Sequence, residues 1–94
     1  MLNIVAFITP KDEFFAVCKE KITNIVEATR SEEGCIRFEV YENKNAQQLV
    51  LVETWVSQSA LEEHYAQPFI TPIFEYYKCA LAKDPEIHHL TEAA

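Results

Sequence analysis

The hydrophobic pattern at the start of the chain predicts a strand followed by a helix. Residues 2–8, LNIVAFI, form a short apolar run rich in β-branched side chains, which is typical of a strand. From Asp12 to about Thr29 the apolar side chains recur at helical spacing and define one buried face. Gly34, the only glycine, follows this helix, where we expect a left-handed C-terminal cap.

Two alternating segments in the middle of the chain predict an antiparallel hairpin. Residues 35–42, CIRFEVYE, alternate in polarity, the next five residues, NKNAQ, are a polar turn, and residues 48–56, QLVLVETWV, alternate again. Two strands joined by so short a turn pair with each other. A register symmetric about the turn places Arg37 opposite Glu53, and the opposite charges of these side chains favour that register.

The last third of the chain predicts a broken helix and a final strand. Ser57 or Ser59 can cap the first helical segment, which stops near Pro68. A second segment starts with Thr71 as its cap, because a proline follows in the first turn. EIHHL, residues 86–90, then forms a short strand.

The predicted order of strand, helix, strand, strand, broken helix and strand is the ferredoxin-like split βαβ pattern of the α+β class. We expect a single domain over residues 1–94, with residues 91–94 as a loose tail. One layer of helices covers one face of such a sheet, and here 49% of the residues are hydrophobic. The surplus apolar surface predicts a homodimer in which two open sheet faces meet.

Charge and composition exclude several classes of partner. The formal net charge is -7 and no basic cluster occurs, which argues against nucleic acid and anionic membranes as partners. The first residues lack a basic segment and a small-residue cleavage site, so we do not expect a signal peptide. Cys18, Cys35 and Cys79 are widely spaced, so we interpret them as reduced thiols of a cytoplasmic protein. No ligand cluster or glycine-rich phosphate loop is present, so we expect neither a metal nor a cofactor.

The stretch VETWVSQSALEEHY, residues 52–65, places three chemically useful side chains around one corner between a strand and a helix. Trp55 can stack on a flat ligand, and its alternative role is core packing. His64 can act as a general base because imidazole titrates near neutrality, and its alternative role is a helix-face histidine bonded to a carboxylate or water. Glu53 either orients His64 or the substrate, or simply pairs with Arg37.

The motifs EEGC, VETWVSQSALEEH and QPF, in this order and spacing, resemble the antibiotic biosynthesis monooxygenase (ABM) family. The resemblance implies a dimeric α+β barrel of ferredoxin-like subunits. Members of that family include cofactor-free oxygenases of quinols and polycyclic phenols, relatives that degrade haem, an isomerase of a phosphorylated dione, and proteins without an assigned activity. In this family the ligand lies between the sheet and the helices, beside the strand tryptophan. Trp55 then faces the pocket, and the valine-rich face of the same strand meets the partner subunit.

By this resemblance we predict a cofactor-independent monooxygenase that oxidises a small flat quinol or phenolic ligand with O2. The alternatives are a non-catalytic, stress-associated module that binds a small ligand, and an isomerase of a small dione. His64 and Trp55 are the candidate catalytic residues. The candidate substrate-binding residues are Trp55, Glu53, Arg37, Tyr41, Leu51 and Tyr65. Leu51 stands where the best-studied oxygenases of the family have an asparagine, so an oxyanion-stabilising amide is missing there.

Overall fold

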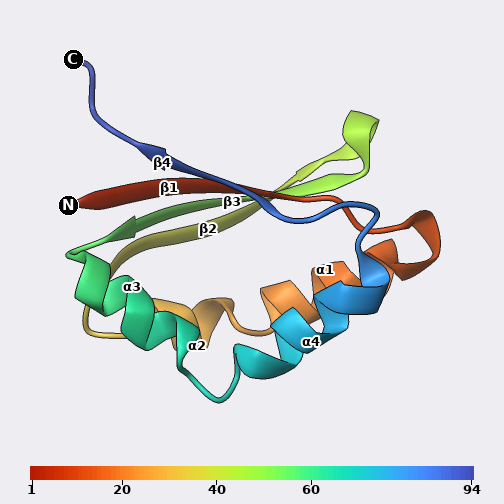
Figure 1. Cartoon of the computed structure of the whole chain (residues 1–94), viewed down its shortest axis with the longest axis horizontal. Coiled ribbons are helices and arrows are strands. Elements are labelled where there is room, and N and C mark those ends of the chain that lie inside the picture. The colour runs from red at the N-terminus through yellow and green to blue at the C-terminus, as the bar shows by residue number, and fades with distance from the viewer.

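The computed structural model describes residues 1–94, and its elements confirm the predicted ferredoxin-like α+β fold. Four strands form one antiparallel sheet in the order β2-β3-β1-β4, and the helices cover only one of its faces (Figure 1). The strands are β1 (Leu2–Ile8), β2 (Cys35–Asn43), β3 (Gln48–Trp55) and β4 (Glu86–Leu90). The helices are η1 (Asp12–Phe14), α1 (Phe15–Thr23), α2 (Val26–Arg30), η2 (Lys44–Ala46), α3 (Gln58–Tyr65) and α4 (Thr71–Ala80).

The first helical region is interrupted, whereas the sequence pattern predicted one helix from Asp12 to about Thr29. The α1 helix ends at Thr23 and α2 begins at Val26, with Asn24 and Ile25 between them. A β-branched residue followed by asparagine has a low helix propensity, since the asparagine side chain competes for backbone hydrogen bonds. The apolar face nevertheless continues through the break, so the region still covers the sheet as one layer.

Gly34 has a different role from the predicted left-handed cap, because no glycine of the chain has a positive φ. A Cβ at this position would overlap the Cβ of Ala60 in α3 and lie 3.2 Å from Val56 Cγ2. The Gly34 carbonyl also accepts a hydrogen bond of 2.9 Å from the Val56 backbone N–H. The missing side chain therefore lets the loop before β2 pack directly against the start of α3.

The register of the β2–β3 hairpin differs from the predicted one by a single residue. The pairing shifts between Cys35 and Arg37, so Arg37 lies opposite Thr54 and Phe38 lies opposite Glu53. The predicted Arg37–Glu53 pair is therefore wrong. A bulge adds one residue to a strand, and a shift of one residue moves the following side chains to the other face of the sheet. The shift points Phe38 into the core, where it is 1% exposed.

The two faces of β3 are divided as predicted. Leu49, Leu51, Glu53 and Trp55 are all buried on the face covered by the helices. Val50 and Val52 point to the opposite face and are only partly buried. The helix-covered face thus holds the core and any site between the sheet and the helices.

The helices α3 and α4 begin in different ways. Ser57 caps α3, since its Oγ accepts a hydrogen bond of 3.1 Å from the Ala60 N–H. Thr71 is the first helical residue of α4 rather than its cap, and Pro72 lies in the first turn. Both helices lie on the same side of the sheet (Figure 1), and α4 packs beside α1.

Candidate functional site

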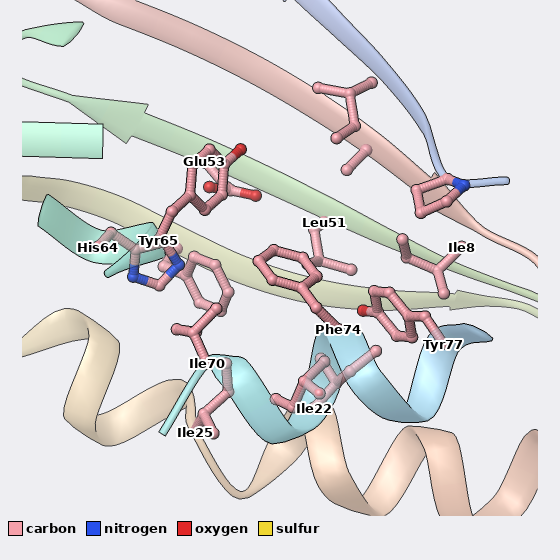
Figure 2. A pocket seen from close by; sticks show the side chains of 15 residues that line it. Ile8, Ile22, Ile25, Leu51, Glu53, His64, Tyr65, Ile70, Phe74 and Tyr77 are labelled. Atoms are coloured by element: carbon pink, nitrogen blue, oxygen red, sulfur yellow. The ribbon is translucent and has the colours of Figure 1, made fainter. Parts of the chain in front are cut away.

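A cavity of about 350 Å³ lies between the sheet and the helices. This volume is within the range of small-molecule sites in proteins, about 300–1,000 Å³. Most of its wall is apolar, from Ile8 of β1, Ile22 of α1, Leu51 of β3, Ile70, and Phe74 of α4 (Figure 2). Such a wall favours a ligand with a large apolar surface.

The polar side chains of the cavity are few, and three of them lie at one end. Figure 2 shows Glu53, His64 and Tyr65 grouped at this end, and Tyr77 of α4 stands farther along the cavity. No lysine or arginine lines the cavity. The arrangement can hydrogen-bond one polar edge of a ligand whose remaining surface is apolar.

His64 is buried on the inner face of α3, with 3% of its surface exposed. Its Nδ1 atom lies 2.6 Å from Oε2 of Glu32, which belongs to the loop before β2. The ring packs against Trp55 at a centroid distance of 4.6 Å and against Phe38 at 5.9 Å. These contacts fix the imidazole at the edge of the cavity.

Glu53 is a buried carboxyl group, 6% exposed, held by Trp55 instead of the predicted Arg37. The Trp55 indole Nε1–H donates a hydrogen bond of 2.9 Å to Oε1 of Glu53. Burial raises the pKa of Glu53 above its usual range, while the Trp55 hydrogen bond and the nearby His64 oppose that rise. No side chain bonds to the second carboxylate oxygen, which is not fully enclosed, and Glu53 lines the cavity.

Trp55 itself does not line the cavity. Its side chain is 0% exposed and lies behind Glu53 and His64, which both do. We therefore interpret Trp55 as the support of these two side chains rather than as a wall that touches the ligand.

Two tyrosines add hydroxyl groups to the site. Burial, with a smaller effect of the Glu53 charge, raises the pKa of Tyr65 above its usual range. Burial also raises the pKa of Tyr77. Both phenols therefore stay protonated at neutral pH and can donate hydrogen bonds. Tyr65 and Phe74 are partly exposed and stack edge to face at 5.8 Å, so they form part of the cavity mouth.

The structure brings only some of the predicted substrate-binding residues together. Leu51, Glu53 and Tyr65 line the cavity. Arg37 and Tyr41 lie on the open face of the sheet, where both side chains bond to Glu39, at 2.8 and 2.6 Å. The hairpin bulge explains their position, because it reverses the face on which the side chains of β2 point.

The carboxylate partner of His64 was missed by the sequence analysis. Glu32 lies in the EEGC motif, which was used only to mark the end of a helix and the family resemblance. The sequence did contain a hint, because an acidic residue in a distinctive loop motif can hydrogen-bond to a histidine elsewhere in the fold. No spacing rule joins two residues that lie 32 positions apart.

The structure contains neither a metal-binding cluster nor a membrane-spanning helix. No group of three His, Cys, Asp or Glu side chains is arranged to hold a metal ion. None of the helices combines the length and the apolar character needed to cross a lipid bilayer.

Comparison with known proteins identifies the family. The model of the antibiotic biosynthesis monooxygenase family matches residues 1–71, from β1 through α3. The chain belongs to this family. The matched region contains Glu32, Glu53, Trp55 and His64, which make up the polar end of the cavity and its support.

Curated relatives of this ABM chain are longer than it is. "Uncharacterized protein sll1783" of Synechocystis sp. is 33% identical over 78 residues, which cover 82% of this chain and 50% of that protein. "Putative monooxygenase Rv0793" of Mycobacterium tuberculosis is 29% identical over 65 residues, which cover 69% of this chain and 64% of that protein. These sequence matches therefore cover about half to two thirds of the length of the two relatives.

Solved structures share the whole fold. The structure of Rv0793 from Mycobacterium tuberculosis has a TM-score of 0.90 at 24% identity and covers 99% of this chain and 98% of its own. A conserved protein from Methanosarcina mazei has a TM-score of 0.85 at 28% identity, covering 95% of this chain and 89% of its own. The matches extend beyond the family model to include α4 and β4.

Proposed function

We propose that this ABM protein is a cofactor-independent monooxygenase of a small, flat quinol or related phenol. The cavity suits such a ligand, since it is apolar along most of its length and polar at one end. The observation that carries the proposal is the position of His64, a buried imidazole beside the cavity with its Nδ1 atom bonded to Glu32.

The second ring nitrogen of His64 is the proton acceptor in this proposal. The hydrogen bonds that His64 makes to other side chains involve Nδ1 only. Nε2 is not among the fully enclosed atoms that lack a partner, and His64 lines the cavity. A ligand hydroxyl at the polar end can therefore donate its proton to Nε2.

Removal of that proton makes the ligand more reactive toward O2. A phenolate is a better electron donor than a phenol, so the substrate itself can serve as the reductant. One oxygen atom enters a ring carbon as a hydroxyl group, and the other leaves as water. The quinol supplies two electrons on becoming a quinone and two more as its C–H bond becomes a C–O bond, which together reduce one O2.

Glu53, Tyr65 and Tyr77 orient the ligand in this proposal. The free carboxyl oxygen of Glu53 contacts a second hydroxyl, and the tyrosines donate hydrogen bonds to developing quinone oxygens. Trp55 acts through Glu53 and His64, which it supports. Arg37 and Tyr41, on the open face, have no part in binding within the same subunit.

The cavity also bears on the alternative activities. A phosphorylated dione needs a cationic or amide-rich cradle for its phosphate, and no lysine or arginine lines the cavity. A non-catalytic ligand-binding module is the second candidate. Leu51 favours it, since this side chain cannot supply the oxyanion-stabilising amide of the best-studied oxygenases.

We also propose that two chains assemble as a homodimer through their open sheet faces. Val5 and Phe7 of β1 pair with Val52 and Val50 of β3 in the centre of this face, which no helix covers (Figure 1). Burial of such an apolar centre stabilises a symmetric dimer. Sedimentation should give about twice the chain mass of 10.9 kDa, and a stable monomer at micromolar concentration would contradict the assembly.

Oxygen uptake by a His64→Gln variant tests the proposed activity. We expect the variant to bind reduced quinols but to turn over about 10²–10⁴-fold more slowly, which is the usual contribution of a general base. His89→Ala is the matched control, since His89 is exposed in β4 and should leave the rate unchanged. A His64→Gln variant with the wild-type rate would refute the role of His64. Ligand binding without any turnover by the wild type would favour the binding module.

A further inference from the structure

The contact between Glu32 and His64 is short and shielded from solvent. Their atoms Oε2 and Nδ1 lie 2.6 Å apart, and their side chains are 11% and 4% exposed. The two residues come from different parts of the fold, the loop before β2 and the helix α3. A short, shielded contact of this kind orients an imidazole ring strongly.

The Glu32 side chain is held in place before any ligand binds. Its backbone N–H donates to the Thr29 carbonyl, and its own carbonyl accepts from the Cys35 N–H, both at 3.0 Å. Its other carboxylate oxygen, Oε1, accepts a hydrogen bond from Gln67 Nε2 at 3.4 Å. Two residues later, Gly34 packs directly against α3. The loop and the helix that carries His64 are thus locked together.

The chemistry of a carboxylate decides which nitrogen of the ring carries the proton. A carboxylate can only accept hydrogen bonds, so a neutral imidazole must present Nδ1–H to it and keep Nε2 bare. We propose that Glu32 is a positioning residue that fixes His64 in the Nδ1–H tautomer and so presents Nε2 to the cavity as a proton acceptor. The use of that acceptor in catalysis rests on the proposed function, whereas the tautomer itself does not.

The other carboxylates near this site cannot take the same role. Glu53 is engaged by the Trp55 indole through Oε1 and makes no hydrogen bond to the imidazole. Glu33 is next to Glu32 in the chain, but its side chain is exposed and does not bond to His64. Glu33 therefore provides a matched control in the same loop.

Nitrogen NMR of the imidazole tests the inference without substrate. In the wild-type protein at mildly alkaline pH, we expect the His64 signals of a neutral ring with the proton on Nδ1 and none on Nε2. Glu32→Gln should change this pattern, because an amide can donate to Nδ1 and move the ring proton to Nε2. Glu33→Gln should keep the wild-type pattern. A wild-type ring protonated on Nε2 or on both nitrogens, or a Glu32→Gln spectrum identical to that of the wild type, would overturn the proposal.

Turnover separates this inference from the proposed function. If quinols are substrates, Glu32→Gln should lower kcat at least about tenfold, and by no more than the roughly 10²–10⁴-fold that the base contributes. It should leave KM nearly unchanged, since Glu32 does not line the cavity. An inactive wild type with the expected NMR pattern would refute the oxygenase and leave the positioning role intact. An active enzyme whose kcat does not respond to Glu32→Gln would refute the positioning role alone.

Discussion

Replacing Gly34 with alanine tests whether the loop before β2 is docked on α3 as tightly as the structure shows. The new Cβ would overlap the Cβ of Ala60 and lie 3.2 Å from Val56 Cγ2. Both neighbours lie close to the backbone, Ala60 within α3, so rotation of a flexible side chain cannot relieve the overlap. The loop and the helix must move apart to restore the ordinary distance between two carbon atoms in contact, about 3.5–4.0 Å.

The size of the effect follows from two opposing terms. Overpacking of a well-packed site costs about 1–3 kcal/mol. Alanine also lowers the conformational entropy of the unfolded chain, which stabilises the protein by about 0.4–1 kcal/mol. This gain applies because the φ of Gly34 is not in the left-handed region. We expect a net loss of about 1–2 kcal/mol, and Tm falls by about 4–8 °C per kcal/mol in a domain of this size.

Urea unfolding of a double-mutant cycle is the assay. Ala60→Gly alone should cost up to about 1 kcal/mol of helix propensity. In the Gly34→Ala/Ala60→Gly double variant the overlap disappears, so its loss should be smaller than the sum of the single losses by about 1 kcal/mol or more. Strict additivity of the two single losses would refute the docking of this loop on α3.

Three further predictions follow from the buried groups. Burial raises the pKa of Glu53, so its contribution to stability is complete below the ordinary glutamate pKa and is lost as pH rises through the raised value. Glu53→Gln should therefore gain stability over the wild type as pH rises, and a pH-independent difference in urea unfolding would contradict this. Trp55→Phe should cost about 2–4 kcal/mol of unfolding free energy in the same assay, because it leaves a void and removes the hydrogen-bond donor to Glu53. A loss typical of a surface substitution would show that the Trp55–Glu53 contact contributes little to stability. Burial raises the pKa of Cys18 to about 11, so alkylation followed by mass spectrometry should label the exposed Cys79 first, and equal rates would contradict the burial.

The strands were predictable because their apolar periodicity is a local property of the chain. The predicted bounds of β1 and β4 match the structure, and the buried face of β3 was identified from alternation alone. The break between α1 and α2 was missed, because the apolar face continues across it while the backbone does not. Local patterns thus gave the order of the elements and the layer structure.

The details of the site depend on contacts that local patterns do not encode. A single bulge near Cys35 moved Arg37 to the open face, and no feature of the alternation marks a bulge. The sequence left Trp55 as either a ligand wall or core packing, and only the fold shows its side chain fully enclosed beside Glu53. Glu32 reaches His64 only because the loop before β2 docks on α3. Such pairings arise from tertiary structure and become visible only in the fold.

The products formed from a reduced quinol under O2 test the central claim most directly. With the purified protein and no added cofactor, we predict one O2 consumed per quinol, without accumulation of hydrogen peroxide. Mass spectrometry should show a product that has gained one oxygen atom and lost two hydrogen atoms. A quinone without added oxygen, formed together with hydrogen peroxide, or no oxygen uptake above the uncatalysed rate, would contradict the monooxygenase account.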